Sequence, residues 1–372
     1  MSLPSDPQYE HIPTSTLSSL VTNDVRTSHG VPGGHVTYHS QRFGKIDLRV
    51  PPHPDIEEGR KLFAHYLWHA AVIAAEGLER ASSDAEIGER APQGQSDGDE
   101  ERKMTGNWPK RYWDVRGKKV LELGAGTALP SIIAVLSGSL SATITDHPSS
   151  PALTTGAIEQ NVQRNVVERL KWPEAAGARA STSPLCSSTT LMPNRGSPAV
   201  DIFGYTWGMA KMYLPSHYGK SAERQPKDFD RIIIADCLWM PAQHVNLVKT
   251  ILHYLCQEPS QPVSPAESCA LVVAGFHTGR EIVRHFFEVA TGEFNLPPRP
   301  PSTELGEDHK DKLGKKDEDG DPDRQEVQGR LRAAEIFEID ANGLRRPWEP
   351  VRPKEDNDQA KRWCVVAVLE RR

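Results

Sequence analysis

One stretch of this 372-residue chain predicts its fold: Lys119-Val-Leu-Glu-Leu-Gly-Ala-Gly-Thr-Ala-Leu-Pro-Ser-Ile-Ile-Ala134. Its apolar residues Val120 to Leu123 predict a buried strand, and the glycine turn Gly124-Ala125-Gly126 leads from that strand into a helix. A second apolar run, Ala142 to Thr145, ends at Asp146. This order predicts a nucleotide-binding βαβ unit. In such a unit the glycines let the ligand approach the backbone closely, and the carboxylate accepts hydrogen bonds from ribose hydroxyls.

The identity of the nucleotide depends on two further positions. Dinucleotide-binding turns carry a third glycine three residues after the second, and here that position is Leu129. Glu122, two residues before the first glycine, would repel a pyrophosphate but suits a ligand with a cationic amine. We therefore expect S-adenosylmethionine, with NAD and a purely structural βα turn as the alternatives.

Composition and charge exclude several classes of partner. The net charge is −6 with no basic stripe, so we expect no nucleic-acid partner. No apolar run approaches the roughly 20 residues that cross a bilayer, and the N-terminus lacks a secretory pattern. Five cysteines without a Cys-x-x-Cys pair indicate reduced thiols in the cytoplasm, with the nucleus as an alternative, and we expect no metal site.

Apolar strands and amphipathic helices alternate along most of the chain. Further strands are expected at Asp201–Tyr205, Arg231–Ala235 and Ala270–Ala274, and helices at Leu62–Leu78, Ala157–Leu170, His244–Leu255 and Arg280–Ala290. This alternation predicts an α/β fold with a mainly parallel sheet covered on both faces. Two final strands, Glu335–Asp340 and Trp363–Leu369, predict an antiparallel hairpin at one edge, and His35–His39 with Ile46–Val50 predicts a short hairpin before the main domain.

Polar, low-complexity segments separate these elements. Residues 1–30 are rich in proline, serine and threonine and are expected to be disordered. Residues 31–372 are expected to form one domain, with flexible insertions near 81–106, 172–198 and 296–329. We expect this domain to be a monomer.

Five segments together resemble a known family. Val120–Ser131 is similar to motif I of the seven-β-strand methyltransferases, which have a Rossmann-like class I fold and use S-adenosylmethionine. His65-Tyr-Leu-Trp68, Thr145-Asp146, Gly204-Tyr-Thr-Trp-Gly208 and Asp236-Cys-Leu-Trp239 resemble the lysine methyltransferase-like branch known as family 16. This branch includes fungal nicotinamide N-methyltransferase-like proteins and an enzyme that methylates translation elongation factor 1-alpha.

The resemblance implies a role for each candidate residue. The predicted cofactor-binding residues are Trp68, Glu122, Gly124, Ala125, Gly126, Asp146, Trp207 and Ala235. Glu122 is expected to interact with the cofactor's ammonium group or with backbone amides of the turn. Asp236 is expected to orient an amine and aid removal of its proton, and Trp239 to contact the amine's stem.

Several alternatives stay open at this stage. Asp236 also suits a helix N-cap, Trp68 and Trp239 suit core packing, and His277 is expected to be a solvated loop residue rather than a substrate contact. A nucleophilic role for Cys237 is rejected, since methyl transfer needs none. The expected function is protein N-methylation on a lysine or N-terminal amine of a cytosolic protein such as a translation factor. The alternatives are a small-molecule, nicotinamide-like N-methyltransferase and a non-catalytic binding module.

Overall fold

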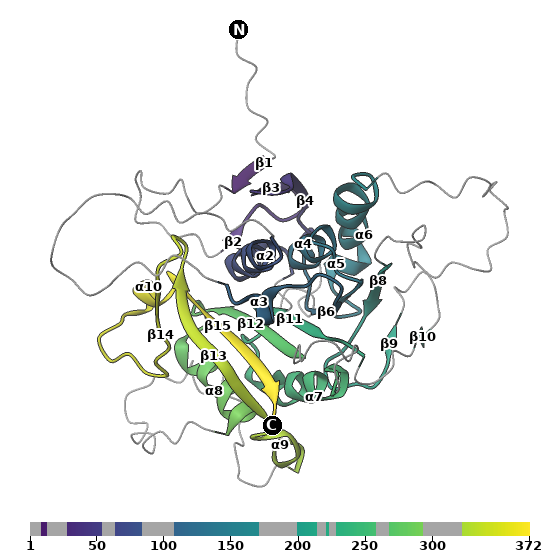
Figure 1. Ribbon diagram of the computed structural model, residues 1–372. Helices are drawn as coiled ribbons and strands as arrows, with labels where there is room; N and C mark the ends of the chain where they lie inside the picture. The colour runs from purple at the N-terminus through teal and green to yellow at the C-terminus, as the bar shows by residue number, and fades with distance from the viewer. Residues whose placement is uncertain are drawn as a thin grey trace.

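The computed structural model describes residues 9–12, 28–53, 64–83, 108–170, 199–213, 221–222, 228–257, 268–292 and 322–372. A ten-stranded sheet in the order β10-β9-β8-β7-β6-β11-β12-β15-β13-β14 lies at its centre (Figure 1). Its five central strands are parallel: β8 (Ala199–Gly204), β7 (Ser141–Asp146), β6 (Lys119–Leu123), β11 (Arg231–Ala235) and β12 (Cys269–Gly275). The chain builds outward from β6 in one direction and then from β11 in the other. The boundary between these strands is therefore the point at which sheets of this kind bind ligands.

Both sheet edges are antiparallel. Strand β15 (Trp363–Arg371) pairs with both β12 and β13 (Leu331–Asp340), and β14 (Arg345–Pro347) pairs with β13. Short strands β9 (Met212–Tyr213) and β10 (Ser221–Ala222) finish the opposite edge. The mainly parallel sheet with an antiparallel edge confirms the predicted Rossmann-like fold. The closing pair is not a simple hairpin, because β14 and α10 (Asn357–Ala360) lie in its connection.

Helices cover both faces of the sheet, because successive strand residues point to opposite sides. Val120, Ile144 and Ile233 pack toward one apolar core, whereas Leu121, Leu123 and Ile232 pack toward the other. The first core lies under α2 (His69–Ala81), α3 (Lys110–Trp113), α4 (Leu129–Leu136), α5 (Pro151–Thr154) and α6 (Ala157–Val162) (Figure 1). The second lies under α7 (His244–Tyr254), α8 (Arg280–Thr291) and α9 (Pro322–Val327). In the described part of the chain, no helix has the length and apolar character that a membrane crossing requires.

A small sheet sits outside the main one. Strands β3 (His35–Ser40) and β4 (Gly44–Arg49) pair antiparallel, which confirms the predicted hairpin. Asn161 attaches this hairpin to α6, because its side-chain amide exchanges hydrogen bonds of 2.6 and 3.0 Å with the backbone of Arg49. Strand β1 (Tyr9–Ile12) pairs parallel with β3, so this part of the segment 1–30 is not without structure; residues 1–8 and 13–27 lie outside the described residues.

Three predicted helical or flexible segments need correction. The helix expected from Leu62 begins at His69, because Leu67–Trp68 forms strand β5 and pairs with β2 (Ser28–His29). The helix expected to reach Leu170 ends at Val162 and continues as a π-helix over Gln163–Val167, which apolar spacing does not reveal. Helix α9 occupies the end of the insertion expected at 296–329, where Val327 is buried.

Most of the three expected insertions lies outside the described residues, namely in residues 84–107, 171–198 and 293–321.

Candidate active site

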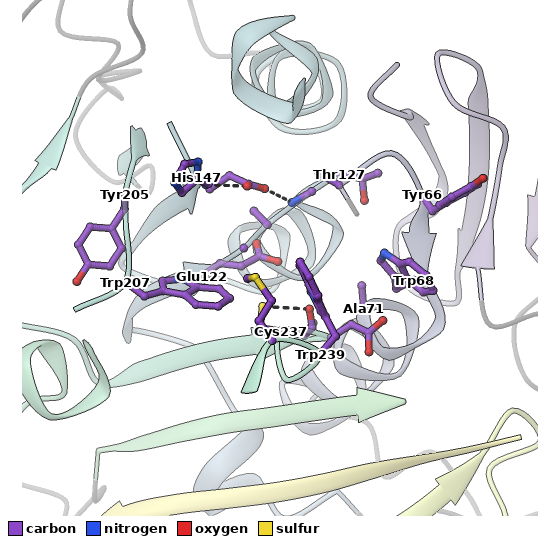
Figure 2. A pocket seen from close by; sticks show the side chains of 18 of the residues that line it. Tyr66, Trp68, Ala71, Glu122, Thr127, His147, Tyr205, Trp207, Cys237 and Trp239 are labelled. Carbon is purple, nitrogen blue, oxygen red and sulfur yellow. Dashed lines mark hydrogen bonds between the residues drawn. The ribbon is translucent and has the colours of Figure 1, made fainter. Parts of the chain in front are cut away.

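A pocket opens at the carboxyl ends of β6, β7, β8 and β11, with about 1000 Å³ of empty space that includes solvent at its mouth. All ten candidate residues from the sequence analysis line it: Trp68, Glu122, Gly124, Ala125, Gly126, Asp146, Trp207, Ala235, Asp236 and Trp239. Figure 2 shows Tyr205 and Trp207 on one side of the pocket and Tyr66 and Trp68 on the opposite side. The sequence therefore selected residues that the fold brings together from five separate segments.

The glycine turn forms the floor because its backbone is left-handed. Gly124 has φ 66° and Gly126 has φ 54°, values that residues with a Cβ rarely adopt. A Cβ on Gly124 would also stand 2.7 Å from the Cys237 sulfur and 3.5 Å from the Trp207 ring. Gly124 is thus required twice, by its conformation and by the close approach of the β11 segment.

Asp146 holds the turn against the end of β7. Its two carboxylate oxygens accept hydrogen bonds from the backbone N–H groups of Gly126 at 2.8 Å and His147 at 2.7 Å. Burial raises the pKa of Asp146, and these hydrogen bonds oppose the shift. An ionised carboxylate has about four acceptor positions, so two backbone bonds leave capacity for ligand hydroxyls.

Glu122 lies beneath the turn, and its surroundings separate the two expected roles. It is 1% exposed and accepts a hydrogen bond of 3.1 Å from the Ser131 backbone N–H in the first turn of α4. Burial raises the pKa of Glu122 to about 8, so the carboxyl is mainly protonated at neutral pH in the free protein. The structure therefore favours the contact with a backbone amide over a fixed negative charge for an ammonium group.

The loop that carries Trp207 packs against α7. The Gly208 backbone N–H donates to the Thr250 hydroxyl at 2.8 Å, and a Cβ on Gly208 would stand 2.7 Å from Oδ1 of Asn246. Gly208 also has φ 84°. The glycine after Trp207 therefore lets this loop lie against α7 while the indole contributes to the pocket.

Asp236 is held in a strained conformation at the end of β11. It has φ 59°, although it is not glycine, and it is 8% exposed. Its Oδ1 accepts a hydrogen bond of 3.1 Å from the Gly275 backbone N–H on β12. The N-cap alternative is wrong, because the following 3-10 helix (Pro241–Gln243) and α7 begin at caps Met240 and Gln243. Left-handed backbone at a buried, pocket-facing acid is typical of functional sites.

The His277 ring lies beside this carboxylate, and its environment was predicted incorrectly from sequence. The His277 ring stacks on Trp68 with centroids 4.6 Å apart and an interplanar angle of 14°. His277 Nδ1 lies 3.8 Å from Asp236 Oδ2, and the histidine side chain is only 17% exposed. The expected solvated loop histidine is therefore a half-buried neighbour of the site. Only its position just after strand β12 could have signalled this.

A hydrogen bond from the first residue of α7 supports the loop that carries Trp239. His244 Nε2 lies 2.8 Å from the Leu238 carbonyl oxygen, and burial lowers the pKa of His244 to about 3. The neutral imidazole therefore donates from Nε2 and fixes the loop between Asp236 and α7. Trp239 is half-buried and lines the pocket.

Cys237 lies in the site but is not placed as a nucleophile. Burial raises the pKa of the Cys237 thiol, which donates to the Leu123 carbonyl at 3.2 Å and is therefore not an activated nucleophile. Within the described ranges, no group of three or more potential ligands is arranged to hold a metal.

The charge of the lining decides which ligands fit. No lysine or arginine occurs among the described residues that line the pocket, whereas the carboxyl groups of Asp146 and Asp236 do; Glu122 also lines it but is mainly protonated at neutral pH. Leu129, the first residue of α4, occupies the position of the third dinucleotide glycine. Such a lining suits a nucleoside with positive charge better than one with phosphates.

Comparison with known proteins agrees with this geometry. Residues 55–184 match the lysine methyltransferase family. A protein N-terminal and lysine N-methyltransferase EFM7 from Gibberella zeae is 31% identical over 37% of this chain and 43% of its own length. A protein of the same name from Candida glabrata is 31% identical over 57% of this chain and 61% of its own length. Residues 55–184 therefore carry the lysine methyltransferase-family sequence, while the chain matches about half the length of these relatives.

Among solved structures, a Pyrococcus horikoshii TYW2 in complex with MeSAdo aligns with a TM-score of 0.35 and 9% identity. The alignment covers 92% of this chain and 72% of that one.

Proposed function

We propose that this lysine methyltransferase-family chain is an S-adenosylmethionine-dependent N-methyltransferase that modifies an amine of a protein, on a lysine side chain or at the N-terminus. One observation carries the proposal: a buried acid with left-handed backbone, Asp236, lines an aromatic pocket that contains no lysine or arginine among its described lining residues. The names of the relatives from Gibberella zeae and Candida glabrata support the same reaction.

The chain's own residues suit each part of this cofactor. The turn Gly124–Gly126 would lie against the methionyl (amino-acid) portion of the cofactor, and Asp146 would accept hydrogen bonds from its ribose hydroxyls. Trp207 and Ala235 would border the adenine, and Trp68 would close over the bound molecule. When bound, S-adenosylmethionine supplies an electrophilic methyl group, so the protein needs mainly to position the amine and accept a proton.

Asp236 and Trp239 would prepare the amine. A lysine ammonium is protonated at neutral pH, and only the neutral amine has the lone pair that attacks. The Asp236 carboxylate would attract the ammonium into the pocket and accept its proton, while Trp239 would lie along the methylene stem. Glu122 would stay protonated beneath the turn, because its pKa is raised to about 8.

A cytosolic protein, such as a translation factor, is our proposed substrate. The pocket is open to solvent, and its lining includes Tyr66, Trp68, Trp239 and Met240, which offer apolar surface to a side chain that enters on a larger molecule. This surface favours a protein acceptor over a free heterocycle such as nicotinamide.

The proposal is tested by following labelled methyl transfer from S-adenosylmethionine to three acceptors. These are recombinant unmethylated translation elongation factor 1-alpha, the same factor with an acetylated N-terminus, and nicotinamide. Label on the first two indicates lysine, and label on the first alone indicates the N-terminal amine. Label on nicotinamide alone would contradict a protein substrate, and binding without transfer to any acceptor, including proteins of a cell extract, would favour the non-catalytic binding module.

A further inference from the structure

Three groups from distant segments converge at the acceptor side of the pocket. Asp236 follows β11, His277 follows β12, and Trp68 ends β5. The His277 ring lies parallel to Trp68 at 4.6 Å, and its Nδ1 faces Asp236 Oδ2 at 3.8 Å. Together they place an imidazole behind the acid that the proposed function uses.

We propose that His277 is a positioning residue that receives the substrate's proton from Asp236, with its ring set by Trp68. This inference rests on the proposed methyltransferase function and extends it with a route for the proton. The route begins at a lysine-type ammonium beside Asp236 and ends in solvent beyond the imidazole.

The arrangement favours this route for geometric reasons. Asp236 Oδ1 is occupied by the Gly275 N–H at 3.1 Å, which leaves Oδ2 as the oxygen that faces the imidazole. A Cβ on Gly275 would lie 3.1 Å from His277 Nδ1, so the glycine provides the space in which the ring approaches the acid. A separation of 3.8 Å exceeds a hydrogen bond, and such contacts often shorten only when substrate is bound.

Each proton step balances without another reagent. The ammonium N–H bond breaks, its electron pair remains on nitrogen, and an O–H bond forms at Asp236 Oδ2. That O–H bond then breaks as an N–H bond forms at His277 Nδ1, which requires the tautomer with hydrogen on Nε2. The resulting imidazolium releases the Nε2 proton to water. The amine keeps the lone pair with which it attacks the methyl group.

Neighbouring charged groups do not compete for this proton. Burial raises the pKa of the thiols Cys237 and Cys364, so both are neutral beside Asp236. Arg280, at the start of α8, is engaged by Glu338 at 2.5 Å and Glu355 at 2.6 Å. Burial raises the pKa of Asp236, and the charge of the nearby His277 opposes that rise.

The decisive variant is His277→Phe, which keeps a ring for Trp68 to stack on but removes both nitrogens. In the wild type, the fall of kcat at low pH (the acid limb of the pH profile) should reflect protonation of Asp236 and His277 together. In the variant it should reflect protonation of Asp236 alone. We expect kcat on unmethylated elongation factor 1-alpha to fall at least about tenfold and its acid limb to move to lower pH. Affinity for S-adenosylmethionine should stay unchanged. His277→Gln, which restores polarity without a titrating ring, should not rescue the limb.

A second measurement does not depend on turnover. In the acceptor-free protein, the ¹³C carboxyl signal of Asp236 should titrate at higher pH in His277→Phe than in wild type, because the opposing positive charge is lost. An unchanged titration would overturn the coupling even if no acceptor is ever methylated.

Kinetics then separate the remaining cases. If the wild type transfers methyl groups and His277→Phe retains its rate and pH profile, the proton route is wrong while the proposed function stands. A lower rate without movement of the limb, or a limb moved to higher pH, would also contradict the route.

Discussion

The two halves of the pocket differ in how their residues are distributed along the sequence. The half at β6 and β7 holds the glycine turn and Asp146, which lie within 23 residues of each other on one βαβ unit. The half at the end of β11 brings Trp68 together with Asp236, and His277, which follows β12, lies beside these two residues just outside the pocket lining. The compact half can therefore be predicted from one motif, whereas in the assembled half the contacts of His277 with Trp68 and Asp236 become visible only when the sheet places its strand ends together.

The largest expected effect tests the assembled half. Asp236→Asn should lower kcat by roughly 10² to 10⁴-fold, because the amide cannot accept the amine's proton. Affinity for S-adenosylmethionine, measured by calorimetry, should change little. Asp340→Asn is the matched control, since Asp340 is also 8% exposed but caps the turn after β13 through the N–H groups of Asn342 and Leu344. Equal activity of wild type and Asp236→Asn would remove the catalytic assignment.

The next largest effect concerns Glu122, which lies beneath the glycine turn of the compact half, and the dependence of stability on pH. The pKa of Glu122 is raised to about 8 in the folded protein, against an ordinary value of 4.5. A folded state that holds the proton more tightly loses stability as pH rises from about 4.5 to about 8. Glu122→Gln keeps an acceptor for the Ser131 N–H and removes this loss. We expect the variant to match wild type near pH 4 and to be more stable by roughly 4 to 5 kcal/mol near pH 8.5.

Urea unfolding at several pH values measures this difference. The same variant separates the two roles first considered for Glu122, because a direct ionic contact with the cofactor's ammonium would make Glu122→Gln bind S-adenosylmethionine more weakly at pH 7. Unchanged affinity is the result that the buried, protonated carboxyl predicts.

A third change tests the ribose contact of the compact half. Asp146→Ala should weaken S-adenosylmethionine binding by about 1.5 to 3 kcal/mol, because hydrogen bonds to a charged acceptor are lost. Asp146→Asn, which keeps one carbonyl oxygen, should be milder. Calorimetric affinities of both variants check this, and an alanine variant with wild-type affinity would show that the ribose lies elsewhere.

The smallest expected effect joins the two halves. Gly124→Ala and Gly126→Ala both place alanine at positive φ, but the Gly124 Cβ would meet the Cys237 sulfur at 2.7 Å, whereas the nearest atom to the Gly126 Cβ is 4.0 Å away. We expect Gly124→Ala to be less stable than Gly126→Ala by about 1 kcal/mol or more, as overpacking requires. Adding Cys237→Ala should recover that difference, and equal stability of the two glycine variants would disprove the close contact.

Much of the fold followed from local pattern. The run Arg231–Ala235 predicted β11 with its observed bounds, because a strand buried on both faces is continuously apolar. The start of α2 did not follow, because Leu67 and Trp68 satisfy helical spacing yet pair with Ser28 and His29. The π-helix after Val162 also escaped, since its hydrogen-bond shift leaves no mark in apolar periodicity.

The site shows the same division. Glycine turns and strand-end acids carry their roles in residue type, so Gly124, Asp146 and Asp236 could be selected from sequence and all line the pocket. His277 could not, because its role depends on a stacking partner 209 residues earlier, Trp68, and an acid on the neighbouring strand. The positive φ of Asp236, likewise, is imposed by tertiary structure and not by its neighbours in sequence.

The central claim is that this pocket binds a positively charged nucleoside cofactor and not a phosphorylated one. Calorimetric titration of the full chain with S-adenosylmethionine and, separately, with NAD tests it most directly. We predict one site for S-adenosylmethionine and no heat of binding for NAD. Binding of NAD alone would contradict the methyltransferase assignment, and binding of neither would contradict the reading of this pocket as a cofactor site.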